Sequence, residues 1–302
     1  MRIRTLPLAA TAVAIALGST ACKAPADSSG AGDQPSATVA TQTVDQAAAD
    51  LLPAAIKQSG VVKVASGVSF PPMEYFASDN RTVLGFDADL GKALGEVLGV
   101  KFTFVNTNFD GIIAGLTAHR FDLGLTSMID KKERQANVDF VDYLSSGVSF
   151  LVSKGNPKGL TSGDSLCGHP VAVEKGSTGD IEADALSADC TKAGKQAIAK
   201  QAYPDQASAV QALQSGRADA VLALDLTLAY NVKQAPNQFE IGSKPFDTLP
   251  IGIPVPKDDT QLRDAVQAAL KAIEANGTYQ QLLAKWNLTD QALTGAPLNT
   301  GK

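Results

Sequence analysis

The sequence is poor in the residues that build metal and redox sites. It contains three cysteines and two histidines among 302 residues, and no two cysteines stand in a Cys-x-x-Cys arrangement. A zinc or thiol-redox site is therefore not expected. The chain also lacks a Gly-x-x-x-x-Gly-Lys-Ser/Thr phosphate loop, so any ATP hydrolysis must come from another protein. We expect no cofactor and no metal.

Clusters of basic residues are also missing. The chain has 26 Lys and Arg against 31 Asp and Glu, and without Arg2 and Arg4 the net charge becomes −7. An acidic chain without a basic patch argues against a nucleic-acid partner. Hydrophobic residues make up 44% of the sequence, which suffices for two ordinary cores in the region after the N-terminal segment.

The N-terminal segment has no apolar run long enough to cross a bilayer. The run from Leu6 to Leu17 holds about 12 residues, whereas the hydrocarbon core is about 30 Å thick. A basic start, a short apolar core and small residues predict an export signal over residues 1–21. A membrane anchor helix is the alternative. Cys22 directly follows the small residues and resembles the lipidated cysteine of a bacterial lipobox, with Ser19 where that motif has Leu.

Residues 22–50 are rich in Ala, Ser, Thr, Gly, Pro, Asp and Gln. Such a composition predicts a disordered tether, reaching roughly 25 Å, that lifts a domain off the outer face of the cell membrane. A leader without an anchoring role is the alternative. Export favours a disulfide between Cys167 and Cys190, which would contribute about 3 kcal/mol by closing their loop, although two free thiols remain possible at this stage.

A helix-turn-strand pattern occurs twice. The first copy lies within residues 110–140, where an apolar run at 121–125 is followed by Thr126 and Ser127. The second copy, 209–225, lies 97 residues further on and ends in Asp225. Open α/β sheets bind ligands at the carboxyl ends of their strands. The repeat therefore predicts two similar lobes that each offer one strand end to a shared site.

A series of segments resembles one known family. In order they read LGFDADL, FDGIIAGL, RFDLGLTSM, KKERQ, VDFVDY, LCGHPVAVEKGST, ALQSGRADAVLALD, IGIPVPKDDTQL and NGTYQQLLAKWNL. Together they span about residues 61–289 and are similar to the bacterial solute-binding proteins of family 3, which serve amino-acid ABC importers.

The resemblance implies an α/β fold of the type II periplasmic-binding-protein kind. Each lobe would be a mixed sheet flanked by helices, and two hinge strands would join the lobes. Lobe 1 would comprise residues 51–148 and 252–302, and lobe 2 residues 149–251.

The same resemblance assigns ligand-binding roles to particular residues. Arg134 would grip the ligand's α-carboxylate, because a guanidinium holds a carboxylate through two parallel hydrogen bonds. Asp225 would hold the ammonium. The aromatic rings of Phe70 and Phe109 would sandwich the ligand. Hydroxyl groups of both lobes would complete the site, namely those of Thr126, Ser127, Ser177 and Thr178. On the residues alone, the alternatives are a solvated arginine, a helix cap, a turn aspartate and core phenylalanines.

Two positions depart from the family pattern. Ile129 replaces a Ser or Thr whose hydroxyl also holds the carboxylate, so it offers only its backbone N–H and favours a larger apolar ligand. Gly67 stands where binders of cationic amino acids often carry an acid. Lysine, arginine and histidine are therefore not the expected ligands, and a neutral or acidic amino acid is.

The sequence thus predicts a monomeric, extracytoplasmic receptor, anchored by lipid on Cys22, that captures a small zwitterionic solute and delivers it to an ABC permease. We expect no enzymatic activity. One alternative is a periplasmic enzyme on the same scaffold, similar to cyclohexadienyl dehydratase, but the sequence offers it no free general acid or base. The other is a ligand sensor for a membrane kinase.

Overall fold

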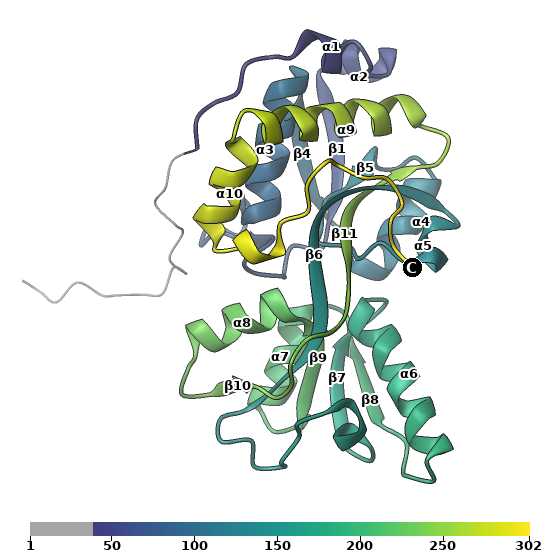
Figure 1. Cartoon of the computed structure of the whole chain (residues 1–302), viewed down its shortest axis with the longest axis vertical. Coiled ribbons are helices and arrows are strands. Elements are labelled where there is room, and N and C mark those ends of the chain that lie inside the picture. Colours follow the sequence, from purple (N-terminus) through teal and green to yellow (C-terminus); the bar gives the residue numbers. More distant parts are fainter. Residues whose placement is uncertain (1–38) are drawn as a thin grey trace, which may run out of the picture. The chain divides into compact units, whose positions relative to one another are not determined.

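The computed structural model describes residues 39–302 (Figure 1). The predictions for the signal peptide, for lipidation of Cys22 and for most of the tether concern residues outside this range. Among residues 39–302, no helix combines the length and the apolar content needed to cross a bilayer.

The first group of elements, which we call lobe 1, is built on a parallel sheet of order β4-β1-β5. Its strands are β1 (Val61–Ser66), β4 (Lys101–Asn106) and β5 (Leu123–Gly124). Its helices are α1 (Gln46–Ala49), α2 (Ala54–Ser59), α3 (Phe86–Leu98), α4 (Ile112–Thr117), α5 (Lys132–Gln135), α9 (Thr260–Ala275) and α10 (Thr278–Trp286). The short elements are β2 (Tyr75–Phe76), β3 (Val83–Leu84), η1 (Phe109–Gly111) and η3 (Thr289–Gln291).

Helix α3 shows how the sequence specifies lobe 1. Phe86, Leu90 and Leu94 recur at a spacing of four and are fully buried, because that spacing places them on one helical face. Gly99 ends the helix in a left-handed conformation with φ of 69°, which glycine adopts without steric cost. The helix therefore covers the core with one face.

The second group, lobe 2, is built on a sheet of order β10-β6-β9-β7-β8. Its strands are β6 (Val138–Ser153), β7 (Pro170–Glu174), β8 (Ala199–Tyr203), β9 (Ala220–Leu224) and β10 (Phe239–Ile241). Its helices are η2 (Gly163–Leu166), α6 (Thr178–Lys192), α7 (Gln206–Gln214) and α8 (Asp225–Gln234). The repeated sequence pattern corresponds to α4 with β5 in lobe 1 and to α7 with β9 in lobe 2.

Two long strands connect the lobes. The first part of β6 pairs with β11 (Phe246–Pro256), and its last part, 148–152, pairs with β9 of the second sheet. Figure 1 shows both strands running from one group of elements to the other. The predicted fold class is confirmed. The predicted lobe boundaries, 148/149 and 251/252, fall inside these strands, and the position of the hinge stays a prediction.

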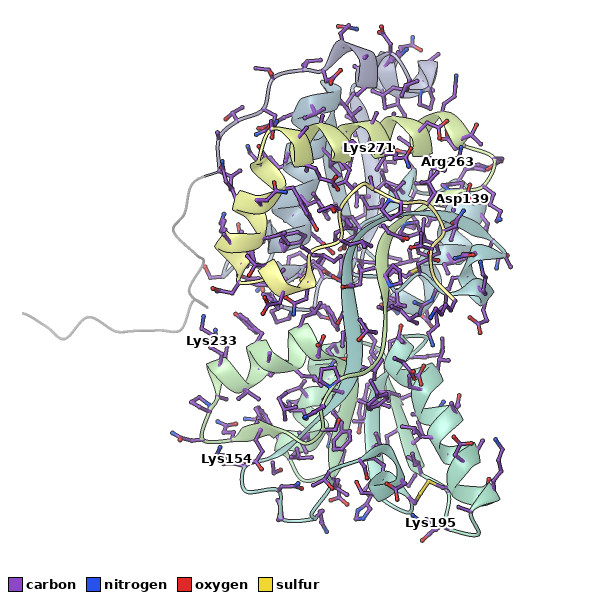
Figure 2. The ribbon with its side chains drawn as sticks, in the orientation of Figure 1. Asp139, Lys154, Lys195, Lys233, Arg263 and Lys271 are labelled. Atoms are coloured by element: carbon purple, nitrogen blue, oxygen red, sulfur yellow. A yellow bond between two sulfur atoms is a disulfide. The ribbon has the colours of Figure 1, made fainter. Side chains whose placement is uncertain are left out.

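Side chains fasten lobe 1 to the connecting strands. Arg263 of α9 donates to the Asp139 carboxylate of β6 at 2.9 Å (Figure 2).

Cys167 and Cys190 form a disulfide in lobe 2, visible as the yellow bond beside Lys195, so the predicted pairing is confirmed. It joins the loop before β7 to the last turn of α6.

Residues 39–50 lie inside the predicted tether yet contact lobe 1. Val39 packs against the hydrophobic core, and Ala48 is buried. The backbone N–H of Gln42 donates to the Glu96 carboxylate at 2.9 Å, and the Gln42 side-chain oxygen accepts from Thr278 at 3.0 Å. A few apolar and amide groups at specific positions thus order a segment whose overall composition predicts disorder.

The C-terminal residues 297–301, which we call the strap, lie along β6. Pro297 accepts a hydrogen bond from the Asp142 N–H at 2.9 Å, and the Gly301 N–H donates to the Asp130 carboxylate at 2.7 Å. A Cβ at Gly301 would lie 2.0 Å from the Asp130 carbonyl oxygen, so only glycine fits there. The strap therefore reaches the loop that leads into α5 and Arg134.

Candidate ligand-binding site

A pocket with about 370 Å³ of empty space is lined by residues of both lobes. Six of the predicted ligand-binding residues line it, namely Phe70, Phe109, Thr126, Ser127, Ser177 and Thr178. Residues predicted from both lobes thus line one pocket, and their roles in ligand binding stay predictions.

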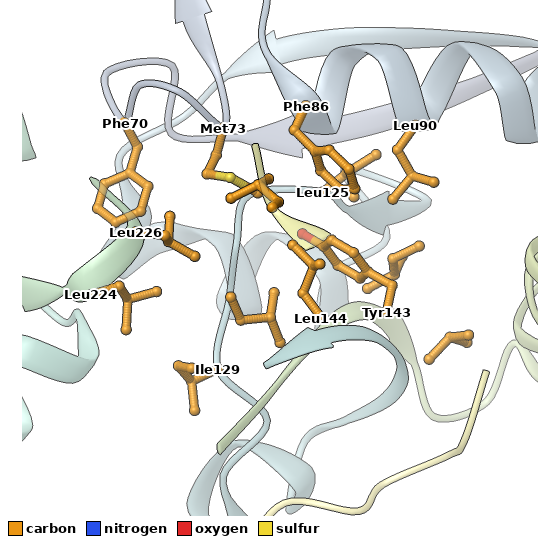
Figure 3. Close-up of a cluster of buried hydrophobic side chains, with 14 of the residues drawn as sticks. Phe70, Met73, Phe86, Leu90, Leu125, Ile129, Tyr143, Leu144, Leu224 and Leu226 are labelled. Atoms are coloured by element: carbon orange, nitrogen blue, oxygen red, sulfur yellow. The ribbon is translucent and has the colours of Figure 1, made fainter. Parts of the chain in front are cut away.

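The Phe70 ring forms part of the apolar side of the pocket. It belongs to the same buried cluster as Leu224, which also lines the pocket, and Figure 3 shows the ring pointing toward Leu224 and Leu226. Phe109 opens the short helix η1. An aromatic residue of lobe 1 and an aliphatic residue of lobe 2 thus contribute to one wall.

Arg134 does not line the pocket itself but adjoins two residues that do. Its guanidinium carbon lies 5.5 Å from the ring centre of Phe109, and Nη1 lies 3.4 Å from the Thr178 hydroxyl. Nη1 also donates to the Ile129 carbonyl at 2.8 Å, and Nη2 to the Gly176 carbonyl at 3.1 Å. Arg134 of lobe 1 therefore reaches the first turn of α6 in lobe 2.

The Arg134 guanidinium is a buried cation without a counter-ion. Arg134 is 6% exposed and forms no ion pair with any residue between 39 and 302. Burial lowers the pKa of Arg134 to about 10, so the group stays protonated at neutral pH. A buried charge held only by neutral oxygens is costly, and an incoming anion would offset that cost.

Ile129 acts through its backbone. Its side chain is 1% exposed and belongs to the core cluster drawn in Figure 3. Its carbonyl accepts from Arg134, and its backbone forms a β-bridge with Ile251 of β11. The predicted contact of its backbone N–H with the ligand stays a prediction.

Helix α6 begins at the pocket, and part of its polar N-terminus is already in use. Ser177 is the N-cap, and its hydroxyl accepts from the Asp180 N–H at 3.2 Å. The Gly176 N–H donates to the Asp180 carboxylate at 2.9 Å. The first-turn N–H groups of Thr178 and Gly179 have no acceptor within the helix, because intrahelical bonds start later. These two donors are the ones available for an anion.

Asp225 lies one residue beyond the pocket lining. It begins α8, directly after Leu224, and its carboxylate accepts from the Ser146 hydroxyl of β6 at 2.5 Å. The structure thus places the predicted ammonium-binding aspartate against a connecting strand. Its role stays a prediction.

Sequence reasoning missed two acidic residues that line the pocket, Glu74 and Glu174. Glu74 is 1% exposed and accepts from the Thr126 hydroxyl at 2.8 Å. Burial and the neighbouring Asp87 carboxyl raise the pKa of Glu74 well above its usual value. The second carboxyl oxygen of Glu74 has no hydrogen-bond partner among the described residues. Asp87 accepts from the Ser127 N–H at 2.8 Å. Glu74 and Asp87 therefore hold the Thr126 and Ser127 strand end in place.

Glu174 is the last residue of β7 and is 4% exposed. Burial raises the pKa of Glu174 to about 8, and the carboxylates of Asp205 and Asp110 add to the rise, while the Gln206 backbone N–H opposes it. The signal was available in the sequence, because Glu174 stands at a strand end, as Asp225 does. The local pattern alone indicates only that Glu174 ends a strand.

Polar contacts between the lobes surround the pocket. Lys131 of lobe 1 forms a largely buried ion pair with Glu182 of α6 at 2.7 Å. Lys175 pairs with Asp110 at 2.8 Å. Such contacts exist only while the two lobes are together, so they favour a closed pocket.

Comparisons with known proteins identify the family. The sequence profile of bacterial extracellular solute-binding proteins, family 3, matches residues 62–289. The L-arginine-binding protein of Pseudomonas aeruginosa is 31% identical over 233 residues, covering 74% of this chain and 87% of its own. The L-cystine-binding protein TcyJ of Escherichia coli K12 is 28% identical over 251 residues, covering 83% and 91%.

Solved structures show the same relationship. An ancestral arginine-binding protein bound to arginine superposes with a TM-score of 0.69 at 33% identity, covering 75% of this chain and 98% of its own. The ancestral amino acid-binding protein AncCDT-1, a precursor of cyclohexadienyl dehydratase, superposes with a TM-score of 0.69 at 31% identity, covering 77% and 97%. From its profile match, its relatives and its two-lobed fold, the chain belongs to the bacterial extracellular solute-binding proteins of family 3.

Proposed function

We propose that this protein is the extracytoplasmic binding subunit of an amino-acid ABC importer and that Arg134 binds the α-carboxylate of its ligand. The observation that carries the proposal is a buried guanidinium that adjoins the pocket and has no counter-ion among residues 39–302. A carboxylate is the anion that matches a guanidinium in shape and charge. The two named relatives are an arginine-binding and a cystine-binding protein, and both of these ligands carry an α-carboxylate.

Ligand binding and closure would be linked. The pocket walls come from both lobes, so a ligand gains its full set of contacts only when the lobes meet. Lobe 1 would comprise residues 51–148 and 252–302, lobe 2 residues 149–251, and the hinge would lie where β6 and β11 cross. The permease would then recognise the closed form.

The protein would act outside the cytoplasm. The export signal over residues 1–21 and lipid on Cys22 would hold it at the outer face of the cell membrane. A Cys22→Ser variant would be released from washed membranes into the soluble fraction. Retention of that variant on the membrane would argue against lipid anchoring.

Titration calorimetry tests the carboxylate role of Arg134. Wild-type protein should bind at least one proteinogenic amino acid, and Arg134→Ala should bind it at least roughly tenfold more weakly, because a charge-assisted hydrogen bond is worth about 1.5–3 kcal/mol. Arg217→Ala is the matched control, since Arg217 is an exposed arginine of lobe 2. Equal affinities of wild type and Arg134→Ala would refute the assignment.

An enzyme is the second candidate function, and Glu174 is the observation that favours it. A carboxyl with a pKa of about 8 inside a pocket can serve as a general acid. The structural neighbour AncCDT-1 is itself an amino acid-binding protein, however, and the named relatives are binding proteins. Incubation with a cyclohexadienyl substrate should leave that substrate unchanged. Catalytic turnover lost in Glu174→Gln would favour the enzyme.

A further inference from the structure

The titratable side chains that line the pocket are of one kind. Among the described residues, Glu74 and Glu174 are the charged side chains in its lining, and both are acidic. Neither forms an ion pair with a lysine or arginine between residues 39 and 302. The cationic Arg134 lies just outside the lining, beside Phe109 and Thr178. The region therefore has an acidic pocket next to a buried cation.

The two acidic residues differ in what they already bind. Glu74 is held within lobe 1, because its Oε1 accepts from Thr126 at 2.8 Å and its carboxyl adjoins that of Asp87. Glu174 receives only the backbone N–H of Gln206 and faces the carboxylates of Asp205 and Asp110. Lys175, the nearest basic residue in sequence, is already paired with Asp110. Glu174 is thus a buried carboxyl still without a cationic partner.

Gln206 strengthens the interpretation of this wall as a polar subsite. It is 2% exposed, lines the pocket, and its side-chain nitrogen has no hydrogen-bond partner among the described residues. A buried amide without a partner is costly, so a polar ligand group is expected to meet it.

We propose, on the basis of the function proposed above, that Glu174 binds a cationic group on the ligand's side chain, so that the substrate is a basic amino acid such as arginine or lysine. The acid that is absent at Gly67 in lobe 1 is thereby supplied from lobe 2, because Gly67 and Glu174 line the same pocket. This inference differs from the neutral or acidic ligand that Gly67 alone predicts.

The charge balance favours a cation over a neutral side chain. A neutral ligand would cover the Glu174 carboxyl near Asp205 and Asp110, and Lys175, paired with Asp110, is the one cation that pairs with any of the three among the described residues. A guanidinium or ammonium would instead form a charge-assisted hydrogen bond inside a water-excluded pocket. Arg134 would bind the carboxylate of the same ligand, so each charged end of the substrate would meet the opposite charge.

Calorimetry with arginine and citrulline tests this inference. Citrulline keeps the α-carboxylate, the α-ammonium and nearly the shape of arginine, but its side chain is uncharged. Wild-type protein should bind L-arginine roughly 10 to 100 times more tightly than L-citrulline. Glu174→Gln should lose most of its arginine affinity while keeping its citrulline affinity. Equal binding of arginine and citrulline by wild type would overturn the inference and leave the proposed function intact.

A second variant separates charge from structural damage. In Gly67→Asp/Glu174→Gln the acid moves to the opposite wall, and the space allows it, since the nearest neighbour of a Cβ at Gly67 would be the Thr126 hydroxyl at 3.6 Å. Recovery of the preference for arginine over citrulline would show that a negative charge in the pocket determines this preference. Arg134→Ala should weaken both ligands alike. If wild type binds no α-amino acid at all, both the proposed function and this inference fail.

Discussion

Replacing Glu174 by Gln should make the ligand-free protein more stable at alkaline pH, although it weakens arginine binding. Burial, together with Asp205 and Asp110, raises the pKa of Glu174 from its ordinary value of 4.5 to about 8. The folded state therefore keeps a proton that the unfolded state loses above about pH 4.5. Stability falls as pH rises between about 4.5 and 8, and the loss is complete above about 8. Gln has no proton to lose, so it removes this part of the pH dependence.

The magnitude follows from the size of the pKa change. Each pH unit over which one group differs in protonation is worth about 1.4 kcal/mol, which sets an upper limit of about 5 kcal/mol for Glu174. Because the pocket can relax and admit water, we expect about 2 kcal/mol at pH 8.5, which corresponds to roughly 4–8 °C in Tm. Burial also raises the pKa of Asp87 to about 6 and that of Asp142 to about 7. These groups titrate in both proteins, so the difference between wild type and variant isolates Glu174.

Urea denaturation of both proteins from pH 5 to pH 8.5 measures the effect. The stability gap should be small at pH 5 and widen toward pH 8.5, whereas Asp290→Asn, an exposed control, should track wild type throughout. Arginine affinity of wild type should rise over the same range, because the bound cation requires the ionised carboxylate. Parallel stability curves for wild type and Glu174→Gln would refute the reasoning.

Three further changes test other parts of the structure. Gly301→Ala should displace the strap from the α5 loop, because a Cβ there has no room. Urea denaturation should show a loss of about 1–3 kcal/mol, and calorimetry should show weaker ligand binding. Lys302→Ala is the control and should behave as wild type. Lys131→Met should weaken ligand binding roughly tenfold, because it leaves the Glu182 carboxylate without its partner when the lobes close. An unchanged Kd would contradict a role of that ion pair in closure. Removing the disulfide with Cys167→Ser/Cys190→Ser should cost about 3 kcal/mol in urea while leaving Kd unchanged, since the bond lies in lobe 2 away from the pocket lining.

The parts of the site predicted from sequence share a physical origin. Thr126 and Ser127 follow a buried strand, and Ser177 and Thr178 are the N-cap and first residue of a helix. Local pattern alone therefore indicates their place at a strand end or a helix N-terminus. Arg134 needed the family resemblance, because a charged loop on its own predicts a solvated side chain. The structure places that side chain between Ile129 and Gly176 by hydrogen bonds that no local pattern specifies.

The features that were missed depend on contacts between distant segments. The strand-end position of Glu174 is visible in the sequence, but its proximity to Asp110, Asp205 and the pocket is not. The order of residues 39–50 depends on α3 and α10, which lie far away in the sequence. The strap at Gly301 likewise depends on Asp130, more than a hundred residues earlier. Composition and periodicity carry no information about such pairings.

Titration of the purified protein with L-arginine, with and without the Arg134→Ala change, tests the central claim most directly. The account predicts a single saturable site in wild type, a loss of affinity of roughly tenfold or more in Arg134→Ala, and unchanged binding in Arg217→Ala. Absence of binding to arginine and to every other α-amino acid, or tight binding that survives Arg134→Ala, would contradict it.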